Sequence, residues 1–135
     1  MKLLIFILLF SLSVHAQDRL LQVGLLTSSV VFNAVGDGLN SKLHYAEGHV
    51  FNGLSVASLL AIPCFTKVGN KVKFLSTYVL LRYGLFDQIY NMSARNHIDY
   101  EGGDNYYDRT VIKLPQNVIY GTKIISLGLV ILLNK

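Results

Sequence analysis

Apolar residues in this chain gather in four long runs separated by polar stretches. The runs cover residues 20–36, 50–65, 74–92 and 117–133, about 16 to 19 residues each. Stretches such as SLLAI and LGLVILL are apolar on every face, unlike the alternating pattern of a half-buried β-strand. Runs of this length with short connections are typical of antiparallel helices. The pattern predicts an all-α protein, a small four-helix bundle of hydrophobic helices.

The expected helices cover about 20–39, 46–65, 74–92 and 117–133, with a polar loop at 93–116. In the sequence GDGLN, Gly38 is typical of a helix end, and Pro63 is expected to close the second run. A chain of 135 residues is long enough for one compact domain. We therefore expect a single helical domain from residue 17 to residue 135.

The amino-acid composition indicates a membrane protein. The chain is 52% hydrophobic and 15% charged, with a mean hydropathy of +0.43, whereas soluble domains carry about 25% charged residues. We expect the bundle to be embedded in a membrane; a helical protein lying on a membrane surface and a very apolar soluble bundle are the alternatives.

The positive charges, which give a net charge of +4, are scattered along the chain, and this argues against nucleic-acid binding. Cys64 is the only cysteine, excludes an intrachain disulfide, and is expected to be a small buried apolar side chain.

The first residues, MKLLIFILLFSLSVHAQ, have the pattern of an export signal. Lys2 precedes an apolar run over 3–12 that is too short to cross a bilayer of about 30 Å. A small residue, Ala16, precedes Gln17 as expected for cleavage. The pattern predicts a signal peptide at 1–16 and a location in a bacterial cell-envelope membrane. An uncleaved membrane anchor is the alternative.

Counting lysine and arginine residues by loop does not orient the bundle in a membrane. One side would hold Lys67, Lys71 and Lys73. The other side would hold Lys42, Arg95, Arg109 and Lys113. The positive-inside rule needs a clear excess on one side, so these counts predict no orientation.

Polar residues recur at helical spacing within three of the apolar runs. The candidate cluster comprises Asn33, Asp37, Asn40, His49, Asn52, Arg82, Asp87 and Asn91. Residues three or four apart share a helix face, and a charge facing lipid costs about 2.5 to 3.5 kcal/mol. We expect the three polar faces to turn inward into one shared interior, with Arg82 paired to Asp37 or Asp87. Such a cluster either fixes the helix packing, marks a helix end, or forms a ligand or ion site.

A catalytic interpretation is the alternative. HYAEGH supplies His44, Glu47 and His49, but the two histidines are five apart and do not match the HExxH spacing. A membrane-embedded hydrolase, with or without a metal, would use Asp37, His49 and Asp87. We favour a non-enzymatic binding or accessory role, with no metal and no cofactor. The expected partners are membrane lipid and a protein of the envelope; the loop IDYEGGDNYYDR is expected to anchor at the membrane boundary or to recognise a partner.

The motifs GDGLN and RYGLFDQIYN, with GH between them, resemble those of a group of small bacterial and phage-associated envelope proteins that carry a signal peptide. The resemblance extends from about residue 31 to residue 108. It implies that Asp37, Asn40, His49, Arg82, Asp87 and Asn91 are the signature residues. It implies no activity.

Overall fold

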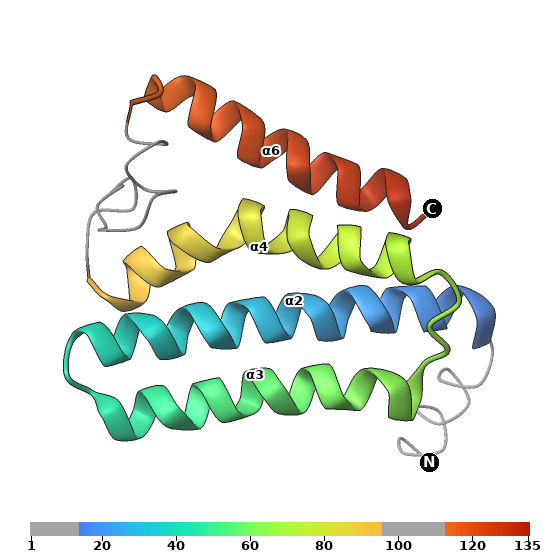
Figure 1. Cartoon of the computed structure of the whole chain (residues 1–135), viewed down its shortest axis with the longest axis horizontal. Helices are drawn as coiled ribbons and strands as arrows, with labels where there is room; N and C mark the ends of the chain where they lie inside the picture. Colours follow the sequence, from blue (N-terminus) through green and yellow to red (C-terminus); the bar gives the residue numbers. More distant parts are fainter. Residues whose placement is uncertain (1–13, 96–112) are drawn as a thin grey trace, which may run out of the picture.

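The structure, a computed structural model, describes residues 14–95 and 113–135 (Figure 1). These residues form four α-helices, α2 (Val14–Ser41), α3 (Tyr45–Phe65), α4 (Lys71–Ser93) and α6 (Gln116–Leu133), and no strand. The predicted all-α fold of hydrophobic helices is thus confirmed. The core of the predicted signal peptide and the loop IDYEGGDNYYDR lie outside the described residues.

The helices lie side by side in the order α3, α2, α4, α6 (Figure 1). Helix α2 packs against both α3 and α4, whereas α6 packs mainly against α4. The chain direction alternates along the sequence, so α2 and α4 run the same way and α3 and α6 run against them. In this row the two middle helices have neighbours on both sides, and the bundle has no single central axis. A middle helix can therefore present polar residues to two different neighbours, and these residues need not share one interior.

Small residues set the spacing between the helices. A Cβ atom built on Gly38 of α2 would lie 2.7 Å from Ser93 Cβ of α4, and one built on Gly84 of α4 would lie 2.8 Å from Ser126 Oγ of α6. Gly36 of α2 and Gly48 of α3 face each other, and each would place a Cβ 2.8 Å from the other's carbonyl oxygen. Glycine is thus the residue that fits at every pairwise contact in the row. Close backbone approach through small residues is the usual packing of membrane helices.

The end of α2 differs from the prediction. Gly38 lies inside the helix, which continues to Ser41. Leu43 then takes a left-handed conformation with φ 65°, and His44 N–H donates to Leu39 O while Leu43 N–H donates to Asn40 O. These two bonds form a Schellman motif, in which the left-handed position is usually glycine. GDGLN was misread because its glycine serves helix packing.

The other helix ends have local causes. Helix α4 begins at Lys71 because the Asn70 side chain accepts a hydrogen bond from Lys73 N–H at 2.9 Å, which caps the first turn. Pro63 does not end α3, which runs on to Phe65. Cys64, next to it, is exposed, so the expectation of a buried thiol is wrong. Helix α2 begins at Val14 and passes through the predicted cleavage site without a break.

The outer faces of the row are apolar. Side chains exposed by more than 60% include Val50, Leu60 and Phe65 on α3 and Ile124, Ile131 and Leu132 on α6. Within the described residues, α3, α6 and the segment Asp18–Ser41 of α2 are long and apolar enough to cross a membrane. Helix α4 does not meet that criterion, although its 23 residues would extend about 35 Å. The most polar helix therefore lies between two apolar ones.

Candidate functional site

A hydrogen-bonded network joins α4, α2 and α3 near the middle of α4. Arg82 Nη1 of α4 donates to Asn33 Oδ1 of α2 at 2.7 Å. Asn33 Nδ2 lies 3.3 Å from Asp37 Oδ2 and 3.3 Å from Asn52 Oδ1 of α3. Asn52 Nδ2 donates to the other carboxylate oxygen of Asp37 at 3.2 Å. We call these residues, Asn33, Asp37, Asn52 and Arg82, the asparagine network.

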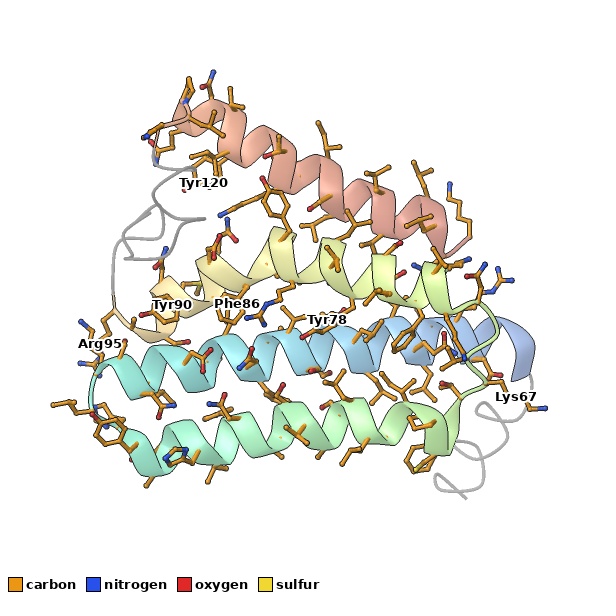
Figure 2. All side chains as sticks on the ribbon, in the orientation of Figure 1. Lys67, Tyr78, Phe86, Tyr90, Arg95 and Tyr120 are labelled. Atoms are coloured by element: carbon orange, nitrogen blue, oxygen red, sulfur yellow. The ribbon has the colours of Figure 1, made fainter. Side chains whose placement is uncertain are left out.

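Local sequence explains how these side chains meet. Asn33 and Asp37 are four residues apart on α2 and share one face. The guanidinium carbon of Arg82 lies 4.2 Å from the centre of the Phe86 ring, one turn further along α4. Phe86 in turn stacks on Tyr90, with ring centres 6.3 Å apart and an interplanar angle of 14° (Figure 2). The aromatic face stabilises the cation by a cation–π interaction where water is scarce.

The contact between Gly36 and Gly48 brings the short Asn52 side chain within reach of Asp37. A Cβ atom on Gly36 would lie 2.7 Å from Asn52 Cγ, so a larger residue would displace the amide from the asparagine network. On the other side of this contact, the Asn40 side chain lies over Gly48, where a Cβ atom would be 2.6 Å from Asn40 Cγ. The buried Asn40 Oδ1 has no hydrogen-bond partner among the described residues. Its position over the glycine Cα fits a weak Cα–H···O contact.

A second charged contact lies on the opposite side of α4, facing α6. Lys123 Nζ donates to Asp87 Oδ2 at 2.8 Å, and the lysine side chain is only 3% exposed. With the Gln88 amide assigned to satisfy its neighbours, its oxygen also accepts from Lys123 Nζ at 3.2 Å. One turn away, the hydroxyls of Tyr83 and Thr122 are 2.6 Å apart. We call Asp87 and Lys123 the lysine pair.

The charges within the helices cancel on each side of α4. Among the described residues, and apart from Asp18 and Arg19 in the second turn of α2, four charged side chains lie away from the first and last turns of the helices: Asp37, Arg82, Asp87 and Lys123. Arg82 is linked through Asn33 to Asp37 on the α2 side, and Asp87 is bound to Lys123 on the α6 side. Each interface therefore holds one positive and one negative charge. Each neighbour of α4 thus supplies the opposite charge for one of the two charged side chains of α4.

The predicted site residues are only partly brought together. Asn33, Asp37, Asn52 and Arg82 meet in the asparagine network, whereas Asp87 lies at the other interface. His49 is exposed and Asn40 packs against Gly48. Asn91 is buried, at 3% exposure.

Lys123 was missing from the predicted set. A lone lysine within the apolar run QNVIYGTKIISLGLVILL was the available signal, because an unpaired cation in that setting is costly. Its partner could have been sought among the acidic residues of the neighbouring runs.

Chemically, the two contacts have their donors and acceptors directed at each other. Both oxygens of Asp37 accept hydrogen bonds from side-chain amides, and Asp87 is bound by an ammonium group. Over 14–95 and 113–135, no group of three or more His, Cys, Asp and Glu side chains is placed to hold a metal ion. Such an arrangement is suited to holding helices in register.

Comparison of the chain with protein-family models, with curated proteins and with solved structures found no match in any of the three. The resemblance to small envelope proteins therefore stays a prediction.

Proposed function

We propose that this chain is an integral membrane protein with a non-enzymatic, accessory or binding role, in which all four helices cross the bilayer. The observation that carries the proposal is the pairing of the α4 charges with both neighbours. Arg82 forms a hydrogen bond with α2 and Asp87 forms a salt bridge with α6. Helix α4 can therefore lie in an apolar medium without an unpaired charge in its middle.

The outer faces support the same proposal. Soluble monomers rarely expose contiguous apolar patches larger than a few hundred Å². Here the outer helices expose large apolar side chains along their length, from Val50 to Phe65 on α3 and from Val118 to Leu133 on α6. Lipid tails are the medium that suits such faces. Membrane lipid is therefore the first partner that we propose.

The role we propose for the asparagine network is to fix the register of α2, α3 and α4. Buried polar groups select one packing among several similar ones, a role best attested in helical bundles. The hydrolase alternative has less support, because Asp37, His49 and Asp87 belong to three separate surroundings. Export by a signal peptide, a location in the bacterial envelope and an envelope protein partner remain parts of the proposal that the sequence motivates.

Extraction of membranes that contain the full chain tests the proposal. Alkaline carbonate removes proteins bound to a membrane surface and leaves integral ones in the pellet. We expect the chain to stay in the pellet after carbonate and to be released only by detergent. Release by carbonate would contradict an integral membrane protein and would favour the surface-bound alternative.

A further inference from the structure

Positive charge gathers at one end of the row. This end, which we call the basic end, holds the starts of α2 and α4 and the last residues of α3 and α6 (Figure 1). Its cations are Arg19, Lys67, Lys71, Lys73 and Lys135, and Asp18 is the single acidic residue described there. Figure 2 labels Lys67 at this end and Arg95 at the opposite one. The count from the loops alone missed Arg19 and Lys135, which the fold brings to this end.

A cavity of about 260 Å³ opens among these charges, between α2, α4 and the segment that connects α3 to α4. Arg19, Lys67 and Lys73 line it, together with Asp18, so its lining carries a net positive charge. Three contacts hold its walls: Arg19 Nη1 donates to Lys135 O at 2.8 Å, Gln22 Nε2 donates to Lys67 O at 2.8 Å, and Asn134 Nδ2 donates to Thr77 Oγ1 at 3.0 Å. The cavity is therefore built by α2, α4, the connection between α3 and α4, and Asn134 just past α6, which are tied to one another.

The lining becomes uncharged and partly apolar along the helices. It extends from Asp18 to Leu26 on α2 and from the N-cap Asn70 to Thr77 on α4, about two turns of each. Val23, Leu26 and Phe74 lie beyond the cations along these helices, together with Thr77, whose hydroxyl already accepts from Asn134. A ligand that matches this order has a negatively charged group at one end and an apolar body at the other.

We infer that this cavity binds the phosphate group of an anionic phospholipid, with Arg19, Lys67 and Lys73 as its charge partners. The inference rests on the proposed membrane location, which brings phospholipid headgroups to the level of the helix ends. Basic pockets between membrane helices are known to hold such headgroups. The first turns of α4 line the cavity, so the partial positive charge of this helix N-terminus lies near it.

The test titrates the detergent-solubilised full chain with short-chain phosphatidylglycerol, short-chain phosphatidylcholine or inorganic phosphate. The readout is the thermal midpoint of unfolding, followed by circular dichroism, since a ligand that binds the folded state raises it. We expect phosphatidylglycerol to bind at least tenfold more tightly than phosphatidylcholine. The double variant Lys67→Gln/Lys73→Gln should weaken phosphatidylglycerol binding about thirtyfold, roughly fivefold for each lysine.

The matched control is Lys42→Gln/Lys113→Gln, which removes two exposed lysines outside the basic end. Its affinity for phosphatidylglycerol should stay within about twofold of the original. Equal binding of the two lipids, or equal losses in the two double variants, would overturn the inference. If inorganic phosphate binds as tightly as phosphatidylglycerol, the cavity is a phosphate site but its ligand is not a phospholipid. If carbonate releases the chain from membranes while the lysine-dependent binding persists, only the membrane proposal fails.

Discussion

Arg82 and Asp87, five residues apart on α4, bind neighbours on opposite sides of that helix. Arg82 donates to Asn33 of α2 at 2.7 Å, and Asp87 accepts from Lys123 of α6 at 2.8 Å. Five residues correspond to about 500° of rotation, so the two side chains lie about 140° apart around the helix. The central helix thus contacts one neighbour through a cation and the other through an anion.

Removal of the Arg82 side chain should destabilise the protein. Arg82→Ala leaves Asn33 and Asp37 part-buried without their cation, and we expect a loss of about 2 to 4 kcal/mol in the free energy of unfolding. Arg95→Ala, at an exposed residue just past the end of α4, is the matched control and should change stability by less than about 0.5 kcal/mol. Chemical unfolding in detergent measures both. Equal stabilities would show that the asparagine network contributes little.

Substitution of the facing glycines should separate packing from backbone effects. Gly36→Ala and Gly48→Ala place a Cβ against Asn52 or Asn40 and the opposite backbone, and each should cost about 1 to 3 kcal/mol. Gly53→Ala, on the same α3, meets no atom within 4 Å and should stabilise its helix by about 0.5 to 1 kcal/mol. Thermal unfolding of the three variants gives the comparison. The same sign for all three would contradict the close contact between α2 and α3.

A double-mutant cycle tests the lysine pair. Lys123→Met leaves the Asp87 carboxylate without its cation, and Asp87→Leu leaves a buried ammonium group, so each change alone should cost about 2 to 4 kcal/mol. The double variant should cost clearly less than the sum of the two, because neither charge remains. A coupling energy of about 1 to 3 kcal/mol is expected. Additive costs would mean that the two side chains do not interact.

The turn after α2 offers a stabilising change. Leu43 has φ 65° and is 73% exposed, so it bears the strain of a left-handed residue while burying little surface. Leu43→Gly should raise stability by about 1 kcal/mol. Leu43→Val, which tolerates this conformation even less well, should lower it. A fall in the thermal midpoint for the glycine variant would contradict the Schellman geometry.

Helical spacing predicted much of the asparagine network. The four-residue spacing of Asn33 and Asp37 puts them on one face, and Arg82 was expected to reach across to another helix. The same periodicity could not say which neighbour each face meets, since that depends on the order of helices in the row. His49 shows the limit: steps of three residues drift by about 60°, so His49 is exposed while Ser55 faces α2 and bonds Ser29 at 3.0 Å.

Apolar runs carry a further ambiguity. A residue facing lipid and a residue facing the core have the same composition, so Cys64 and Pro63 could not be assigned to the outer face of α3 from sequence. Lys123 was overlooked although it is the one charged residue in its helix. Gly38 has the residue type of a helix stop, and only the neighbouring α4 reveals its role in packing. Tertiary neighbours decide each of these cases.

The central claim is that α4 crosses the membrane between α2 and α6. In a Cys64→Ser background, Lys71→Cys and Arg95→Cys introduce one exposed thiol at each end of α4. Spheroplasts that express either variant are treated with a membrane-impermeant maleimide, before and after permeabilisation. We predict that one of the two thiols reacts in intact spheroplasts and that the other reacts only after permeabilisation. Reaction of both thiols in intact spheroplasts would contradict the claim.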